Sequence, residues 1–199
     1  MSDAAVGQRP LAIGPVGRSS LGWWGLLCFI VTEASLFAYL FFAYFYFAVQ
    51  LGDNWLPAGP PSFRFSLPAV IVLIISGIAA WWAERGVRRG VRRDLLLGLL
   101  IAFLLGLAFI ALQLLEWRSK SFTLHSSEYG SVFFIITAFH LAHLAAGELA
   151  LLVLLAWSGF GYFDIRRTAP VLIGTAYWYF VVVVGIVMFM ILYVTPYLR

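Results

Sequence analysis

Five long stretches of apolar residues, separated by shorter polar segments, dominate this 199-residue chain. Each stretch has about the 20 apolar residues that an α-helix needs to cross the hydrocarbon core of a bilayer. The pattern therefore predicts an all-α integral membrane protein, built as a bundle of five transmembrane helices. We expect these helices over residues 21–49, 67–84, 94–116, 127–157 and 170–195.

The residue types at the ends of the stretches agree with these bounds. Ser66 and Asp94 are suitable N-cap residues, because their side chains can accept a hydrogen bond from a free backbone N–H. Pro170 suits the first turn of a helix, where its missing N–H costs nothing. Trp23 and Trp24 open the first stretch, as aromatic residues at a membrane–water interface do.

Positive charge is distributed unevenly between the connecting segments, and this bias predicts the orientation. With the N-terminus in the cytoplasm, nine of the 13 Lys and Arg residues lie on the cytoplasmic side, five of them in the short segment 84–94. Cytoplasmic loops of membrane proteins carry such an excess. We therefore expect residues 1–20 to form a cytoplasmic segment, residues 21–199 to form one membrane domain, and the C-terminus to lie outside.

Composition excludes several classes of protein. The chain is 63% hydrophobic and 11% charged, which is more apolar surface than a soluble chain of this length could bury. Its single cysteine, Cys28, excludes an internal disulfide and CxxC-type metal sites. The net charge of +4 comes from arginines between apolar stretches, so we expect no nucleic-acid partner.

Glu33 is unusual because it lies inside an apolar stretch, roughly 15 Å of helix rise past the interfacial tryptophans. An ionised carboxylate at mid-bilayer costs about 2.5–3.5 kcal/mol on insertion scales. Its own helical face offers only the hydroxyl of Tyr44. Glu33 is therefore either a protonated carboxyl held by one hydrogen bond at a helix interface, or a buried carboxyl that serves proton uptake or lipid contact.

The fourth stretch carries four polar residues on one face. At 100° per residue, Thr137, His140, His143 and Glu148 share an arc of about 140° that also contains Gly147. Ionisable groups inside a membrane face protein or water rather than lipid. We interpret the arc as a polar seam that bonds to neighbouring helices or to a lipid headgroup.

The two histidines of this arc do not suit a cofactor. A bis-histidine haem needs ligands from opposite faces of the ring, whereas His140 and His143 lie on one side of one helix, and His125 lies in an outside loop. A His-x-x-His metal site would need a carboxylate or thiolate partner, and Glu148 is offset from His143 by about 140°. We expect no metal, no haem and no catalytic residue in this chain.

A further polar pair lies near the outer end of the third stretch. Gln113 and Glu116 are one helical turn apart, so they share a face. We expect them to cap the helix or to pair with Arg118, which is a structural role.

Several strings resemble subunit III of the haem–copper respiratory oxidases, in its shorter five-helix bacterial form. "TEASLFAYLFFAYFYF" is similar to the first helix shared by that family, with Glu33 at the position of its intramembrane carboxylate. "LQLLEW" matches a Gln-x-x-Glu-aromatic ending, and "AYWYF" resembles the start of the last helix. The most specific string is "YGSVFFIITAFHLAH", which follows the family's Tyr-Gly-Ser and Phe-His-x-x-His pattern.

The chain also departs from the family pattern at four positions. Ala138 and Leu141 stand where glycine is usual, and Tyr179 and Val182 stand where the family usually has histidine and aspartate in the last helix. These replacements make the chain a divergent member and alter the polar cluster of the last helix.

The resemblance implies an accessory role in aerobic respiration. Subunit III carries no haem or copper, packs against the catalytic subunit I, holds phospholipid in a cleft between its helices and supports proton uptake and durability during turnover. The resemblance thus implies a subunit of cytochrome c oxidase in a bacterial cytoplasmic (inner) membrane, not itself catalytic. Subunits I and II would be its partners, and they would hold the haem and copper.

Three other functions stay open at this point. One is a subunit III-like accessory protein of a quinol oxidase or a nitric-oxide reductase. Another is a stand-alone transporter, although we find neither an inverted repeat nor the pair of broken helices that many transporters have. The third is a b-type cytochrome or quinone enzyme, which the spacing of the histidines disfavours.

Overall fold

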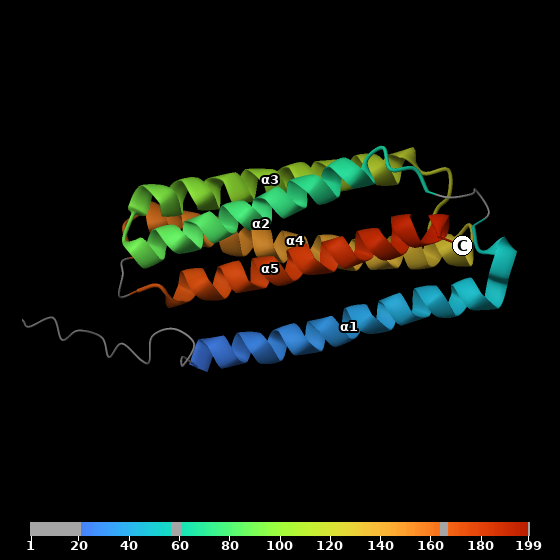
Figure 1. The fold of residues 1–199 in the computed structure, drawn as a ribbon, viewed down its shortest axis with the longest axis horizontal. Helices are drawn as coiled ribbons and strands as arrows, with labels where there is room; N and C mark the ends of the chain where they lie inside the picture. The colour runs from blue at the N-terminus through green and yellow to red at the C-terminus, as the bar shows by residue number, and fades with distance from the viewer. Residues whose placement is uncertain (1–20, 57–60, 164–166, 199) are drawn as a thin grey trace, which may run out of the picture.

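A computed structural model describes residues 21–56, 61–163 and 167–198 of the chain. The described residues form five long helices and no β-strand (Figure 1). The helices are α1 (Leu21–Leu51), α2 (Ser66–Arg89), α3 (Arg92–Ser119), α4 (Glu128–Gly159) and α5 (Ala169–Phe189). Each is long and apolar enough to cross a membrane, which confirms the expected fold class. The expected N-terminal segment over residues 1–20 lies outside the described residues.

The helix ends follow the capping residues, with two corrections. The side chain of Ser127 accepts a hydrogen bond from the Gly130 N–H and caps α4, and Pro170 lies in the first turn of α5. Asp94 was expected to cap the third helix, but α3 begins at Arg92 and Asp94 lies in its first turn. Ser66 is the first residue of α2 rather than its cap. Arginine is a good helix former, so the helices extend beyond the apolar residues.

Helices α2 and α3 form a tight hairpin. Gly90 takes a left-handed conformation, with φ of 72°, and ends α2 two residues before α3 begins. Along the hairpin the backbones approach closely, because a Cβ added at Gly98 would lie 2.6 Å from the Ala83 nitrogen. Small residues permit such contact between membrane helices. The polar turn and the small residues together hold the arginine-rich segment at one end of the bundle.

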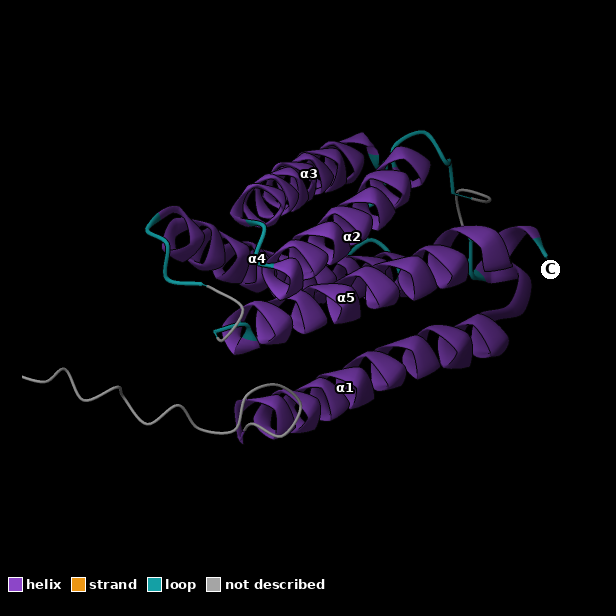
Figure 2. Ribbon diagram, turned by 60° about the vertical axis from the view of Figure 1, so that its left-hand side comes forward, coloured by secondary structure: helices purple, strands orange, loops and turns teal. Residues whose placement is uncertain are grey.

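The remaining helices are arranged around this hairpin. Helix α5 packs against α2 and α4, and α4 also packs against α3. Helix α1 lies at the edge of the bundle, against α4 and α5 and away from the hairpin (Figures 1 and 2). Much of α1 is exposed, including Trp24, Tyr39 and Phe42. The position of α1 brings Glu33 against the polar face of α4.

A π-helical turn, η3 (Met190–Val194), follows α5 and ends in a short 3-10 turn, η4 (Thr195–Tyr197). Such turns shift the direction of the side chains that follow within a helix. In η3, Leu192 and Tyr193 are buried against the aromatic core formed by Tyr44, Trp55, Tyr129 and Phe133. The turn therefore places the Tyr193 hydroxyl inside the bundle, near the end of α3.

Candidate functional site

Glu33 of α1 and His143 of α4 form a hydrogen-bonded pair inside the membrane-spanning region. Glu33 Oε2 lies 2.8 Å from His143 Nε2, and the two side chains are 23% and 14% exposed. The ring of Phe37 packs edge-on against the imidazole at a centroid distance of 5.0 Å. The pair thus joins α1 to α4. The sequence analysis compared Glu33 only with residues on its own helix, where Tyr44 was the one polar side chain. It therefore missed His143 as the partner of Glu33.

The second nitrogen of His143 fixes the protonation pattern of the pair. His143 Nδ1 lies 2.7 Å from the carbonyl oxygen of Phe139, one turn earlier in α4. A carbonyl oxygen can only accept a hydrogen bond, so Nδ1 carries a hydrogen and donates it. Nε2 then either accepts from a neutral Glu33 carboxyl or donates to its carboxylate. In both arrangements one proton lies between Oε2 and Nε2, and the pair has no net charge.

His140 has a different environment although it shares the arc. Its ring is 1% exposed, and Nε2 donates to the carbonyl oxygen of Val181 in α5 at 3.0 Å. Nδ1 has no hydrogen-bond partner among the described residues. Phe37 and Phe109 pack edge-on against the ring. A neutral imidazole that donates through one nitrogen to a backbone carbonyl is a structural bond between α4 and α5.

Thr137 and Glu148, the other two residues of the arc, are both buried. The Thr137 hydroxyl accepts a hydrogen bond from Trp117 Nε1 of α3 at 3.1 Å and donates to the Phe133 carbonyl. Glu148 faces Gly106 of α3, where any side chain would collide with its carboxyl group. Neither carboxyl oxygen of Glu148 has a hydrogen-bond partner among the described residues. The arc therefore faces protein, and its members contact three different helices.

Gln113 and Glu116 lie near the C-terminal end of α3 and are both buried. Glu116 Oε1 accepts a 2.6 Å hydrogen bond from the Tyr193 hydroxyl and lies 3.1 Å from Lys120 Nζ. The expected pairing with Arg118 is wrong, because residues four apart in a helix face one another and residues two apart do not. Lys120 was missed, although its spacing from Glu116 was a usable signal. Gln113 Nε2 has no partner among the described residues.

Another contact missed in the sequence joins α2 to α5. Glu84 Oε2 accepts a 3.0 Å hydrogen bond from the Tyr179 hydroxyl, while Glu84 Oε1 pairs with Arg88 at 2.8 Å. Tyr179 is one of the residues that depart from the family pattern, and its hydroxyl still supplies a polar contact. Val182, the other departure in this helix, lines an apolar groove between α2 and α5. The Glu84–Arg88 spacing in the sequence was a signal for this cluster.

The described residues contain no group of three or more His, Cys, Asp or Glu side chains that could hold a metal ion. Several of their interior polar groups bond from one helix to another. Fold and site together define a multi-spanning helical membrane protein with a carboxyl–imidazole pair in its interior.

Comparison with known protein families shows to which family of membrane proteins the chain belongs. The family model for cytochrome c oxidase subunit III matches residues 18–197, and the chain belongs to this family. Members of this family are subunits of the haem–copper terminal oxidases. The resemblance to subunit III that the sequence motifs indicated is therefore confirmed.

Relatives from animals and bacteria agree with this assignment. The chain is 33% identical over 177 residues to cytochrome c oxidase subunit 3 of Drosophila melanogaster, covering 85% of this chain and 68% of the fly protein. It is 34% identical to the Branchiostoma lanceolatum protein of the same name, covering 85% and 67%. It is 35% identical over 175 residues to a probable cytochrome c oxidase subunit 3 of Mycobacterium bovis, covering 85% of each chain. The bacterial relative thus matches this chain along more of its own length.

Proposed function

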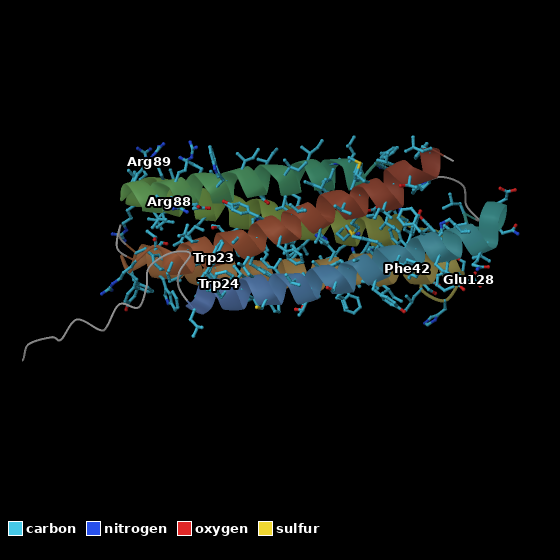
Figure 3. All side chains as sticks on the ribbon, turned by 60° about the horizontal axis from the view of Figure 1, so that its bottom comes forward. Trp23, Trp24, Phe42, Arg88, Arg89 and Glu128 are labelled. Atoms are coloured by element: carbon cyan, nitrogen blue, oxygen red, sulfur yellow. The ribbon has the colours of Figure 1, made fainter. Side chains whose placement is uncertain are left out.

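We propose that this chain is an accessory, non-redox subunit of a proton-pumping cytochrome c oxidase in a bacterial cytoplasmic membrane. It binds the catalytic subunit I and subunit II, and those partners hold the haem and copper. Family membership supports this role. Arg88 and Arg89 lie at the same end of the bundle as Trp23 and Trp24, and Glu128 lies at the opposite end (Figure 3). This arrangement supports an orientation with the arginine-rich turn in the cytoplasm.

The proposed role in proton uptake rests on the pair of Glu33 and His143. Glu33 lies 12 residues after the start of α1 at Leu21, a rise of about 18 Å. A charged group at that depth is costly, but this pair can pass its single proton between Oε2 and Nε2 without changing its net charge. The bond from Nδ1 to the Phe139 carbonyl keeps the imidazole in place during the transfer. Releasing that proton leaves one negative charge on the pair until a proton from the cytoplasmic side replaces it, and in this way the pair holds one proton for uptake by the oxidase.

Holding phospholipid is the other part of the proposed role. Helix α1 exposes large apolar side chains along its length, among them Trp24, Phe29, Phe42 and Tyr46. A continuous apolar surface of this kind is covered by lipid or by a partner subunit. Contact with lipid along α1 would also exclude water from the partly exposed pair of Glu33 and His143.

Replacing Glu33 with glutamine tests the proton role in the assembled oxidase. Glu33→Gln retains the size of the side chain and can donate a hydrogen bond to His143 Nε2, but it cannot exchange a proton. We expect the subunit to stay bound while the rate of proton uptake during turnover falls severalfold. Ser35→Ala is a matched control, because Ser35 lies on the same helix and, among the described residues, its hydroxyl bonds only to the Val31 carbonyl of that helix. An unchanged uptake rate in Glu33→Gln would contradict the proposal.

A further inference from the structure

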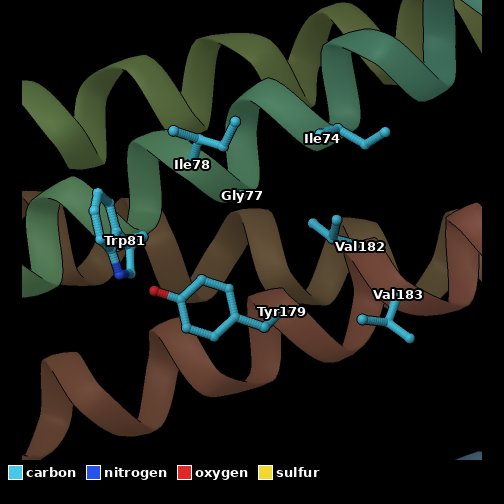
Figure 4. Close-up of a pocket in the computed structure, with 7 residues that line it drawn as sticks. All are labelled: Ile74, Gly77, Ile78, Trp81, Tyr179, Val182 and Val183. Carbon is cyan, nitrogen blue, oxygen red and sulfur yellow. The ribbon is translucent and has the colours of Figure 1, made fainter.

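A small cavity of about 10 Å³ lies between the start of α2, the C-terminal part of α3 and the turn η3. The larger groove between α2 and α5, about 410 Å³, is walled mainly by apolar side chains such as Ile78 and Val182 (Figure 4). The small cavity differs because four polar residues share its lining with apolar ones: Ser66, Gln113, Glu116 and Tyr193. A polar cavity inside a membrane-spanning bundle favours a polar occupant.

The side-chain amide of Gln113 lies at this cavity without a partner from the described residues. The side chain is 3% exposed, and its Nε2 has no hydrogen-bond acceptor among those residues. A buried N–H group without an acceptor is destabilising, and internal water molecules commonly satisfy such groups. Gln113 therefore needs an acceptor inside the cavity.

Two other groups at the cavity are able to accept hydrogen bonds. Glu116 Oε1 accepts from the Tyr193 hydroxyl and lies 3.1 Å from Lys120 Nζ. A carboxylate has about four lone-pair sites, so that of Glu116 can accept further hydrogen bonds. The hydroxyl of Ser66, a residue 4% exposed at the start of α2, also has lone pairs. One buried donor and two buried acceptors thus line the same small space.

Size and charge restrict the occupant to water. A cavity of about 10 Å³ has roughly the size that one water molecule needs. The N–H of Gln113 repels a cation, and the Glu116 carboxylate, already paired with Lys120, repels an anion. Water is neutral, and it accepts through its oxygen while donating two hydrogens, which matches one donor and two acceptors.

We propose that this cavity binds one water molecule, which accepts a hydrogen bond from Gln113 Nε2 and donates to the Glu116 carboxylate and to Ser66 Oγ. The water joins the first residue of α2 to the C-terminal part of α3, beside the Tyr193 hydroxyl that the π turn places there. The Gln-x-x-Glu spacing is then a water-binding pair, in which the glutamine is the donor and the glutamate the acceptor. The site does not depend on the oxidase role proposed above.

The glutamine content of the chain makes the site directly testable. Its three glutamines are Gln8, Gln50 and Gln113, so nitrogen-15 labelling of glutamine alone gives few side-chain signals. Solid-state NMR of the full chain in bilayers would measure through-space transfer from water protons to these amides. We expect a water cross-peak at the Gln113 amide, whose signal is assigned by its loss in Gln113→Met.

Filling the cavity provides an independent arm. Ala69→Val adds two methyl groups at the cavity wall and leaves the polar residues of the site unchanged. We expect it to displace the water and abolish the cross-peak of Gln113, while that of the exposed Gln50 persists in the same spectrum. A Gln113 amide signal without a water cross-peak in the unmodified chain, or a cross-peak of full intensity in Ala69→Val, would overturn the proposal.

A cryo-EM map of the assembled oxidase gives a second readout. In a map that resolves ordered water elsewhere in the complex, density should lie about 2.9 Å from Gln113 Nε2, within hydrogen-bond distance of the Glu116 carboxylate. Such a map without density at this position would equally overturn the water site.

Discussion

Glu33 and Glu116 are two membrane-embedded carboxyl groups with basic partners, and their surroundings differ. Glu33 bonds to an imidazole on another helix, and both side chains stay partly exposed. Glu116 pairs with Lys120 at the end of its own helix and accepts a hydrogen bond from Tyr193, and the two charged side chains are only 3% and 10% exposed. The ammonium group of Lys120 also lies over the rings of Phe133 and Tyr193.

The difference lies in the partner's chemistry. An ammonium group only donates hydrogen bonds and has no acceptor, so the pair of Glu116 and Lys120 is a fixed structural link. A ring nitrogen of an imidazole can either donate or accept a proton, so the pair of Glu33 and His143 can exchange a proton. The pair of Glu116 and Lys120 is suited to hold the C-terminal end of α3 in the bundle, and the pair of Glu33 and His143 is suited to proton exchange.

Removing the cation of the fixed pair should have the largest effect on stability. Lys120→Met retains the length of the side chain but leaves the Glu116 carboxylate without its counter-charge. Breaking a buried pair in this way typically costs about 3–5 kcal/mol. We expect the free energy of unfolding, measured in bicelles, to fall by about 3 kcal/mol.

The matched control for that substitution is Arg118→Met, which removes an exposed cation two residues away. It should change the free energy of unfolding by less than about 0.5 kcal/mol. The double substitution Glu116→Gln with Lys120→Met should recover much of the loss, because no unpaired charge remains. A Lys120→Met protein as stable as the unmodified chain would mean that the pair of Glu116 and Lys120 does not stabilise the bundle.

The contrast between the two pairs also marks how far sequence reasoning extends. Five apolar stretches were enough to predict five helices, because only a helix satisfies every backbone group within a lipid bilayer. The expected caps Ser66 and Asp94 lie inside α2 and α3, but the start of α5 followed from local chemistry, because Pro170 lies in its first turn as expected. The end of α5 did not, because the π turn over Met190–Val194 depends on tertiary packing rather than on a local signal.

Within the candidate site, the residues could be named from the sequence but their partners could not. Glu33 and His143 were each recognised as polar residues at membrane depth, yet they are 110 residues apart and only the packing of α1 on α4 joins them. Likewise, helical periodicity grouped His140 with His143 on one face. It could not show that one bonds to α5 and the other to α1.

Breaking the exchangeable pair should have an intermediate effect. His143→Leu removes both hydrogen bonds of the imidazole and leaves Glu33 without its partner on α4. Hydrogen bonds between membrane helices are typically worth about 0.6–2 kcal/mol, which is enough to loosen α1. We expect the assembled oxidase to lose this subunit faster and to have a shorter working life during turnover, measured as activity against the number of turnovers.

The rate of proton uptake in His143→Leu should fall severalfold, as in Glu33→Gln. Electron transfer among the redox centres, measured within a single turnover, should remain close to that of the unmodified complex, because those centres of the proposed assembly lie in other subunits. His143→Gln is the companion variant, since it can still hydrogen-bond to Glu33 and should restore subunit retention but not proton exchange. A His143→Leu complex that kept this subunit fully bound yet lost tenfold or more of its initial turnover would show that the pair acts directly in the chemistry.

The smallest effect should come from the bond between α3 and α4 that involves neither a carboxyl group nor a titratable partner. Thr137→Val removes the hydroxyl that accepts a hydrogen bond from Trp117 Nε1, and Trp117→Phe removes the donor. A double-mutant cycle on the free energy of unfolding should give a coupling of about 0.6 kcal/mol, the average for such bonds in membranes. The corresponding cycle between Glu33→Leu and His143→Leu should give a larger coupling, because that pair can share a formal charge. Equal couplings in the two cycles would mean that the carboxyl–imidazole pair behaves as an ordinary neutral hydrogen bond, and its distinction from the rest of the seam would fail.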